Sequence, residues 1–417
     1  MSQDTTSQSS NVKQKLFYGY IIVLISFLAM AINAGSRGAF GVFLKPMLED
    51  IGSTRGLISG AFSLSQLVNA CFSILAGRLS DEFGPRIVIT FCGLFMGIGY
   101  LLMSQTTTLW QMYLFYGALI GVGTTFYTPI MSTVAKWFST RRNTMIGIVS
   151  AGGSIGTMIL PLFASWLITS YDWHISFAVL GSIILAVLII SAQFLKKDPT
   201  KSGQQAYGDD TKTEIGSHLQ SEDISLKQAI LTRQFWLLTL VYFLFGFGGF
   251  TLTVHIVPYA TDQGISATSA ASIVSVIGGI GIVSRLVMGG IGDKFGERRV
   301  FLIGFIFRLV AVLWLMSAKE LWMLYLFAIG FGFSFGLGAQ IVPWIAKVFG
   351  TRSLGAISGA CTVGWYIGVA LGPFIAGYIY DSTQSYQWAF LTIAIITLLG
   401  IVISRLIPAI VIKQKNA

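Results

Sequence analysis

Twelve apolar runs, each about as long as a membrane-crossing helix, dominate the sequence. A helix needs about 20 apolar residues to cross the hydrocarbon core of a bilayer. Charged residues make up only 11% of the chain and hydrophobic residues 54%, whereas a soluble domain carries roughly 25% charged residues. A soluble enzyme is therefore excluded, and we predict an all-α integral membrane protein. The runs lie at roughly 17–44, 56–77, 87–104, 109–135, 145–168, 174–195, 235–259, 268–290, 300–317, 321–346, 355–379 and 388–411.

A polar stretch divides the runs into two sets of six. Residues 196–233 carry both charge signs and no long apolar run, which is typical of a solvated loop. We therefore predict a chain of five parts. These are an N-terminal tail (1–16), an N-terminal six-helix bundle (17–195), a central loop (196–233), a C-terminal six-helix bundle (234–411) and a C-terminal tail (412–417).

The positive charges gather on one side of the predicted membrane. Of the 27 Lys and Arg residues, 21 fall on the side of the tails and the central loop. The other six are Lys45, Arg55 and Lys319 on the opposite side, and Arg37, Arg285 and Arg308 within spans. The positive-inside rule then predicts that both termini and the central loop are cytoplasmic in a multi-pass cell membrane protein, at the inner membrane in a bacterium. Because the charges are scattered over loop ends, the net charge of +10 needs no nucleic-acid partner.

An internal repeat relates the two sets of runs. Gly77, Asp81, Gly84 and Arg86 recur as Gly289, Asp293, Gly296 and Arg298, at an offset of 212 residues (293 minus 81). The same offset relates Pro46 to Pro258, Asp50 to Asp262 and Trp110 to Trp322. A parallel repeat of six spans predicts two pseudo-symmetric halves with a binding site between them.

The repeated stretch resembles the signature of the major facilitator superfamily, a GxxxD motif followed by a basic-flanked glycine. This resemblance implies the major facilitator fold, with twelve transmembrane helices in two six-helix bundles. It also implies that the two copies act in gating, because each Asp ends a helix beside basic residues that it can bind in one conformation. The gating residues so predicted are Gly77, Asp81, Arg86, Gly289, Asp293 and Arg298.

Other segments resemble the monocarboxylate transporter and oxalate/formate antiporter group of that superfamily. The run from Lys136 to Gly152 has an aromatic pair, a basic pair and then small residues, and Tyr127 precedes Trp137 by ten residues. The chain departs from the animal monocarboxylate carriers at the first helix and at Gly281, where they have an Asp four residues before an Arg. It also lacks the second intramembrane cation that the oxalate/formate antiporter has in its eleventh helix.

Three arginines fall inside predicted spans, where a charge costs about 3 kcal/mol on insertion scales. All 17 Asp and Glu residues fall in loops, tails or span ends, so these arginines lack an acidic partner at membrane depth. Arg285 lies about 12 Å from the end of its helix, near the membrane midplane, and its planar fork suits a carboxylate. It also matches the Arg with which this family binds substrate. We predict that Arg285 and Arg37 bind the substrate, with Arg37 toward the outer mouth, and that Arg308 is structural or faces lipid.

His255 is the histidine that lies inside a span, and a histidine titrates near neutral pH. We therefore predict that it binds substrate and couples transport to protons, although a hydrogen-bonded packing histidine is an alternative. Tyr127 is the further predicted substrate-binding residue. Weaker candidates for the lining of a small anion pocket are Gln66, Asn69, Gln340, Trp365 and Tyr366.

These features predict a secondary active transporter of small organic anions that works by alternating access. The leading hypothesis is proton-coupled transport of a lactate- or pyruvate-like monocarboxylate. One alternative is an oxalate/formate-type anion antiporter, and another is a drug or metabolite efflux carrier or a transport-dead sensor of the same fold. The expected partners are a carboxylate anion, H⁺ and the lipid bilayer, with the protein acting as a monomer. The sequence has no metal-binding spacing and no catalytic constellation, so we expect no cofactor, no metal and no enzymatic activity.

Overall fold

The structure is a computed structural model that describes residues 17–138, 141–199, 207, 224–350 and 353–407. The predicted tails, 1–16 and 412–417, lie outside the described residues, as does most of the predicted central loop, 196–233. Boundaries of the five predicted parts therefore remain predictions.

Helices account for nearly all of the described chain. The first group comprises α1 (Tyr18–Ile51), α2 (Arg55–Phe83), α3 (Pro85–Met103), α4 (Leu109–Met112), the π-helical η1 (Tyr113–Ile120), α5 (Gly121–Gly123), α6 (Tyr127–Trp137), α7 (Arg142–Ser170) and α8 (Trp173–Gln193). The second group comprises α9 (Leu226–Ile230), α10 (Arg233–Asp262), α11 (Ala267–Phe295), α12 (Glu297–Leu315), α13 (Leu321–Ser334), the 3₁₀-helical η3 (Phe335–Gln340), α14 (Ile341–Phe349), α15 (Leu354–Thr383) and α16 (Gln387–Leu406).

Each predicted apolar run coincides with one helix or with consecutive helices. Among the described residues, 11 helical segments are long and apolar enough to cross a membrane. The remaining run corresponds to α12, which has 19 residues but carries Glu297, Arg298, Arg299 and Arg308. The predicted fold class is confirmed by this architecture, together with the family match described below.

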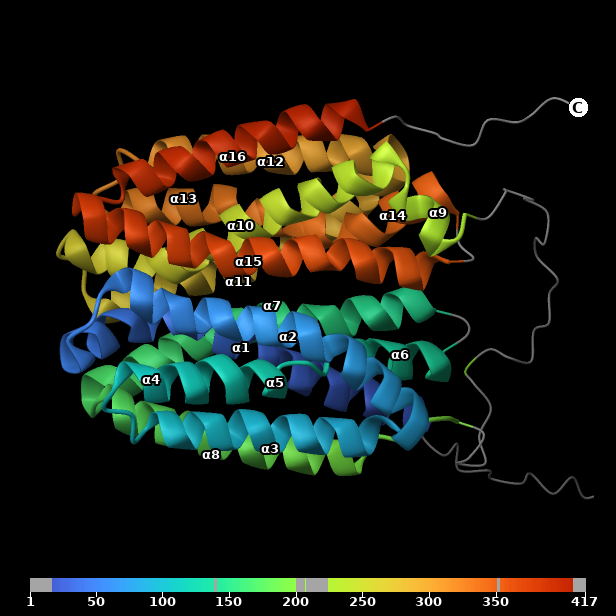
Figure 1. The fold of residues 1–417 in the computed structure, drawn as a ribbon, viewed down its shortest axis with the longest axis horizontal. Coiled ribbons are helices and arrows are strands. Elements are labelled where there is room, and N and C mark those ends of the chain that lie inside the picture. The colour runs from blue at the N-terminus through green and yellow to red at the C-terminus, as the bar shows by residue number, and fades with distance from the viewer. Residues whose placement is uncertain (1–16, 139–140, 200–206, 208–223, 351–352, 408–417) are drawn as a thin grey trace, which may run out of the picture.

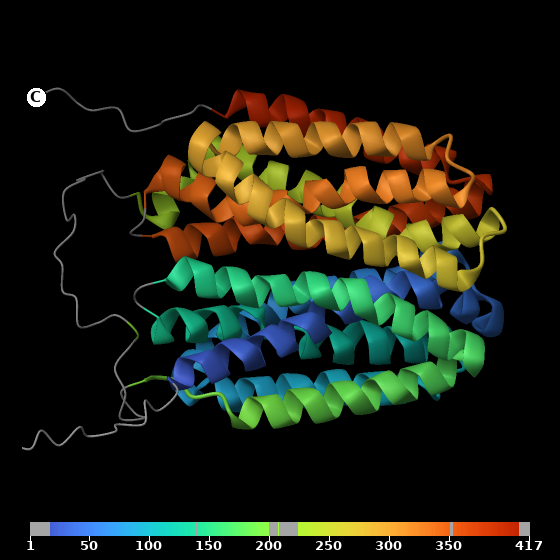
Figure 2. The ribbon, with the colours of Figure 1, turned by 180° about the vertical axis from the view of Figure 1, so that it is seen from behind.

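The helices form two layers that lie side by side. Figures 1 and 2 show α1–α8, in blue to green, in one layer and α10–α16, in yellow to red, in the other. We call these layers the N-half and the C-half. The N-half has one buried apolar cluster and the C-half has two. α1 begins and α16 ends at the same end of the bundle (Figure 1), and we call the opposite end, where α2 begins, the distal end.

The halves meet mainly at three helix pairs, namely α2 with α15, α7 with α11, and α1 with α10. Small residues permit these contacts. A Cβ atom added to Gly377 of α15 would lie 2.7 Å from Cα of Gly56 in α2, and one added to Gly278 of α11 would lie 2.7 Å from the backbone nitrogen of Met158 in α7. Such distances are too short for a side chain, so glycine is what lets the backbones approach.

Two spans that the apolar pattern predicts as continuous are interrupted. The fourth span, Leu109–Trp137, loses its α-helical geometry at residues 124–126, between α5 and α6. In the tenth span, Leu321–Phe349, the 3₁₀ turns of η3 separate α13 from α14. At the repeat offset of 212 residues, Thr124 corresponds to Gly336, so both breaks occur at the same place in the repeat. Discontinuous helices at matching positions of two halves mark the binding site in many transporter folds.

Candidate functional site

Arg285 lies on α11 of the C-half and reaches across to α7 of the N-half. Its Nη1 donates a hydrogen bond of 2.8 Å to the carbonyl oxygen of Ser150 and one of 2.5 Å to Oγ of Ser154. Both acceptors are neutral, and no ion pair joins Arg285 to a carboxylate among the described residues. The guanidinium therefore keeps its charge uncompensated at the contact between the halves.

Arg37 lies on α1, and a neutral amide also holds it. Its Nη2 donates to Oδ1 of Asn33 at 2.5 Å, its Nε donates to the carbonyl oxygen of Asn33 at 3.3 Å, and its guanidinium carbon is 5.9 Å from the ring centroid of Phe250. α1 is 34 residues long and continues to Ile51, beyond the predicted end near residue 44. Arg37 consequently lies near the middle of α1, and its place toward the outer mouth stays a prediction.

Tyr127 lies within electrostatic range of both arginines. It begins α6, directly after the break in the fourth span, and 46% of its surface is exposed. Its hydroxyl is close enough to both Arg285 and Arg37 for their positive charges to act on it, and Arg37 acts on Tyr366 in the same way. We call Arg37, Tyr127 and Arg285 the central site. The structure thus brings together three of the four residues that the sequence nominates for substrate binding.

The weaker candidates lie around these residues. Gln66 and Asn69 are buried in α2, where Asn69 donates to Oγ1 of Thr124 at 2.7 Å. Trp365 packs edge-on against Phe250, with 5.7 Å between the ring centroids. Gln340, at the end of η3, lies against Gly292 of α11. These residues pack around the central site or the breaks, as expected for supporting residues.

Arg308 is fully buried inside the C-half and does not face lipid. Its Nη1 donates to the carbonyl oxygen of Phe245 at 2.9 Å and its Nε donates to Oγ of Ser334 at 3.3 Å. Its guanidinium carbon lies 4.8 Å from the ring centroid of Phe245. Of the two roles predicted for Arg308, the packing geometry favours the structural one.

A polar network closes the distal end between the halves. Arg55, the first residue of α2, binds Asp262 of α10 through both ends of its guanidinium, with Nη1 2.7 Å from Oδ2 and Nη2 2.9 Å from Oδ1. The backbone nitrogens of Arg55 and Gly56 donate to the two carboxylate oxygens of Asp381 at 2.9 and 2.7 Å. The carboxylate of Asp381, in α15, thus occupies the positive N-terminus of α2.

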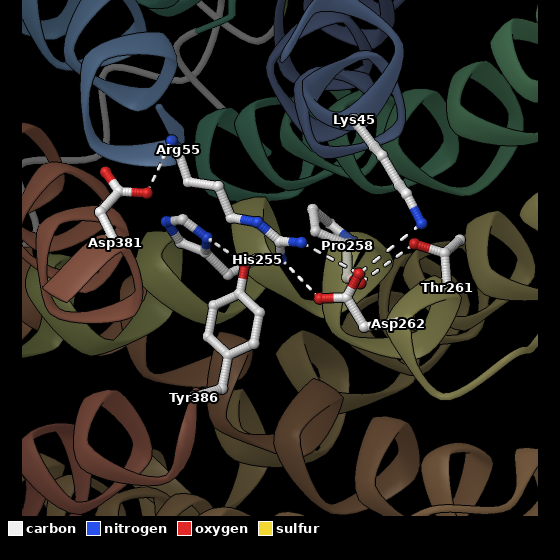
Figure 3. Close-up of polar contacts among 8 residues, drawn as sticks. All are labelled: Lys45, Arg55, His255, Pro258, Thr261, Asp262, Asp381 and Tyr386. Carbon is white, nitrogen blue, oxygen red and sulfur yellow. Dashed lines mark hydrogen bonds and ion pairs between the residues drawn. The ribbon is translucent and has the colours of Figure 1, made fainter. Parts of the chain in front are cut away.

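His255 belongs to this network (Figure 3). Its Nε2 is 2.8 Å from the carbonyl oxygen of Pro373, and its Nδ1 is 3.0 Å from the hydroxyl of Tyr386. A carbonyl only accepts, so we assign the proton to Nε2, and Nδ1 then accepts from Tyr386. The Tyr386 oxygen in turn accepts from Nη1 of Arg55 at 2.9 Å. We call Lys45, Arg55, His255, Asp262, Asp381 and Tyr386 the distal latch.

The latch was not predicted from the sequence. The charge pattern places Arg55 only among the basic residues of the sparsely charged side, and the sequence groups His255 with the substrate-binding residues. The described polar contacts of His255 are with the latch residue Tyr386, with Pro373 and with Ser59, at 3.4 Å from Nε2. A usable signal was present, because Asp262 and Asp381 end spans on the same side as Arg55.

The predicted gating motif lies at the other end of the bundle. In its first copy, Asp81 accepts from Nζ of Lys136 at 3.1 Å, and Arg86 donates to the side chain of Gln193. In the second copy, the surroundings of Gly289 and the side chain of Asp293 are outside the described part of the chain. Arg298 donates to the carbonyl oxygen of Arg405, and Lys347 binds Glu297 at 3.2 Å. These contacts stay within one half.

Two layers of membrane-length helices, with helix breaks at matching positions, form the architecture of membrane transporters that are built from two repeats. The family model described as Major Facilitator Superfamily matches residues 26–294 and 282–416. The chain belongs to the Major Facilitator Superfamily and is a multi-pass membrane transporter, not an enzyme.

Solved structures and curated proteins agree with this assignment. A bacterial homologue of the human lysosomal transporter Spinster, in an inward-facing and occupied conformation, has a TM-score of 0.73 and 16% identity over 94% of this chain and 97% of its own. Monocarboxylate transporter 12 of Rattus norvegicus is 27% identical over 90% of this chain and 82% of its own length. Monocarboxylate transporter 2 of Homo sapiens is 25% identical over 96% and 89%. The oxalate:formate antiporter of Oxalobacter formigenes is 28% identical over 73% and 70%.

Proposed function

We propose that the protein is a secondary active transporter of small organic anions, with proton-coupled transport of a lactate- or pyruvate-like monocarboxylate as its activity. The observation that carries the proposal is the central site. In this site, two arginines from different halves, each held by neutral partners, lie within electrostatic range of one tyrosine. A planar guanidinium binds a carboxylate through two parallel hydrogen bonds. The names of the relatives, monocarboxylate transporters and an oxalate:formate antiporter, support a small carboxylate as the substrate.

The central site suits transport because its charge is uncompensated until the anion arrives. The carboxylate binds Arg285, and the Tyr127 hydroxyl orients it. Neutralising a buried cation removes most of the cost of enclosing it. The two halves then rock around the bound anion and expose it to the other side of the membrane. Arg285 follows this motion directly, because it already bridges α11 and α7.

The distal latch supplies the proton dependence in this proposal. When Nδ1 of His255 is unprotonated, each donor in the hydrogen-bond chain from Pro373 through His255 and Tyr386 to Arg55 has an acceptor. Protonation of Nδ1 displaces the hydroxyl hydrogen of Tyr386 and adds a third positive charge to those of Arg55 and Lys45, both of which bind Asp262. A protonated His255 therefore favours an open latch. The distal end lies opposite the predicted cytoplasmic tails and therefore faces the outside. External acid then increases the population of the outward-open state, which accepts the anion.

Uptake into proteoliposomes tests the activity. We expect the purified protein to accumulate labelled lactate or pyruvate when the outside is more acidic than the lumen, and to stop when a protonophore collapses the gradient. Stabilisation of the purified protein by monocarboxylates and dicarboxylates identifies the substrate independently, because a bound ligand raises the apparent melting temperature. If no carboxylate stabilises the protein or enters the vesicles, the proposal is wrong.

An anion exchanger of the oxalate/formate type is the second candidate, and the similarity to the oxalate:formate antiporter supports it. An exchanger carries oxalate or formate only against internal anion and ignores the pH gradient. Counterflow without net uptake therefore favours exchange, whereas net uptake driven by the gradient favours symport. Efflux of cationic drugs is disfavoured, because the two charges at the central site are both positive.

A further inference from the structure

The breaks in the fourth and tenth spans leave backbone groups without helical partners, and side chains near the two central arginines bind them. In the fourth span, the carbonyl oxygen of Thr124 accepts from Nδ2 of Asn33 at 3.0 Å. The other amide atom of Asn33, Oδ1, accepts from Nη2 of Arg37 at 2.5 Å. One fully buried amide thus joins the break in the fourth span to the guanidinium of Arg37.

The broken turn is itself fixed from the opposite side. Oγ1 of Thr124 accepts from Nδ2 of Asn69 on α2 at 2.7 Å and donates to the carbonyl oxygen of Gly121 at 3.0 Å. Thr124 is 3% exposed and Asn69 is 2% exposed, so water does not compete for these bonds. The partner that Asn33 binds is therefore a fixed point and not a mobile loop.

In the C-half, a side chain of α11 binds the unwound turn of the tenth span. Gly336, the repeat counterpart of Thr124, donates its backbone N–H to Oγ of Ser284 at 3.1 Å. The same hydroxyl donates to the carbonyl oxygen of Phe333 at the end of α13. Ser284 is fully buried, and it directly precedes Arg285 on α11. The residue that directly precedes the second arginine of the central site is thus bound to a helix break.

We propose that Asn33 and Ser284 are positioning residues, each of which fixes one arginine of the central site relative to the unwound turn of a broken span. Both are neutral, so they orient the arginines without neutralising them, and the charge stays free for the anion. A carboxylate at either place would compete with the substrate. This inference rests on the proposed function, because it assigns a purpose to the anion-binding role of Arg37 and Arg285.

Kinetics of Asn33 variants test the first half. We expect Asn33→Ala to raise the KM about tenfold for the best-transported anion among lactate, pyruvate and formate. Vmax should stay within about twofold of wild type, because the substitution weakens anion binding and does not reduce the amount of folded protein. We expect Asn33→Asp to raise KM further, because its carboxylate pairs with Arg37. In an Arg37→Gln background, neither Asn33 variant should change KM any more, as expected for residues that act through one contact.

The control is Thr397→Val, which removes a buried hydroxyl from α16 that donates to Ile393 at 2.7 Å. It should leave KM unchanged. Effects of Asn33→Ala that simply add to those of Arg37→Gln would overturn the positioning role, as would a loss of Vmax at constant KM. If Arg37→Gln alone leaves KM unchanged, the substrate role of Arg37 fails, and that outcome is separate from failure of the positioning role.

Ser284→Ala and Ser284→Thr test the second half by anion-induced stabilisation, which does not require turnover. We expect Ser284→Ala to need about tenfold more anion for the same shift in melting temperature. Ser284→Thr, which keeps the hydroxyl, should recover most of the affinity. The matched control is Ser176→Ala in α8 of the N-half, which removes a buried hydroxyl that donates to the carbonyl oxygen of Asp172 at 2.6 Å. Equal anion affinity in Ser284→Ala and wild type would rule out the role of Ser284.

Discussion

Arg37 and Arg285 are costly residues, and in the proposed mechanism the bound anion accounts for that cost. An arginine at membrane depth without a carboxylate is rare, and such residues face the interior of the bundle or a polar cavity. Here both are held by uncharged acceptors, which preserve their positive charge. Arg308 shows the contrast, because aromatic rings and backbone surround it within the C-half, away from the contact between the halves.

His255→Gln tests proton coupling at the residue scale. The amide keeps a hydrogen-bond donor for Pro373 and cannot be protonated near neutral pH, so the latch no longer responds to acid. We expect uptake driven by a pH gradient to fall at least about tenfold, while counterflow stays within about twofold of wild type. Initial rates between pH 5.5 and 8 measure both. A pH profile identical to that of wild type would show that His255 does not couple transport to protons.

The sequence alone nominates Arg37, Tyr127 and Arg285, because charge and chemistry at membrane depth are visible in a hydropathy pattern. It does not reveal what holds them. Asn33, Ser150 and Ser154 are ordinary helix residues until the fold places them beside an arginine. The latch escaped prediction for the same reason, since Arg55 and Asp262 are 207 residues apart and only packing of the halves joins them.

At the scale of elements, glycine contacts let α2 and α15 approach at the distal end. The hypothetical Cβ of Gly377 would lie 2.7 Å from Cα of Gly56, so even one methyl group forces the helices apart. The contact between Asp381 and the N-terminus of α2 depends on this approach, because Asp381 follows Gly377 by one helical turn.

Gly377→Ala therefore separates the latch partners without altering them. We expect it to lower uptake at least about threefold. We also expect cysteines introduced at the distal end to react faster with a membrane-impermeant thiol reagent. Gly359→Ala on the same helix is the matched control, because a Cβ at Gly359 meets no atom within 4 Å. Comparable transport by Gly377→Ala and Gly359→Ala would show that the close approach is dispensable.

Hydropathy predicts where the spans lie but not where they break. The fourth and tenth spans are apolar enough on average to cross a membrane as continuous helices, and glycines such as those in Gly121-Val-Gly123 and Phe335-Gly336-Leu337-Gly338 are frequent in membrane helices generally. The breaks exist because tertiary partners bind the released backbone groups. Those partners, Asn33 and Ser284, lie far from the breaks in sequence.

At the scale of the molecule, the distal end is closed by charged contacts between the halves. Arg55 makes the central contact, with its side chain 9% exposed and bound to Asp262 through two bonds. Removing one partner of such a buried pair costs about 3–5 kcal/mol, since the other charge is left unpaired. That free energy is available only in the closed state, so its loss shifts the balance between conformations.

Arg55→Gln is therefore expected to favour the open distal end by at least about tenfold in population. Spin labels at Glu49→Cys and Lys319→Cys, both exposed at that end, report the distance between the halves after Cys71, Cys92 and Cys361 are replaced by Ser. The long-distance population should grow in Arg55→Gln and not in Arg299→Gln, an exposed arginine at the other end. An unchanged distribution would remove Arg55 from the latch.

Uptake by Arg285 variants tests most directly whether the protein carries an anion through the central site. Proteoliposomes with equal amounts of wild type, Arg285→Ala, Arg285→Lys and the control Arg299→Ala receive the same labelled carboxylate. We predict that Arg285→Ala loses at least about 99% of uptake, that Arg285→Lys retains a small fraction because its point charge lacks the planar fork, and that Arg299→Ala transports normally. Near-normal uptake by folded Arg285→Ala would contradict the assignment of this site.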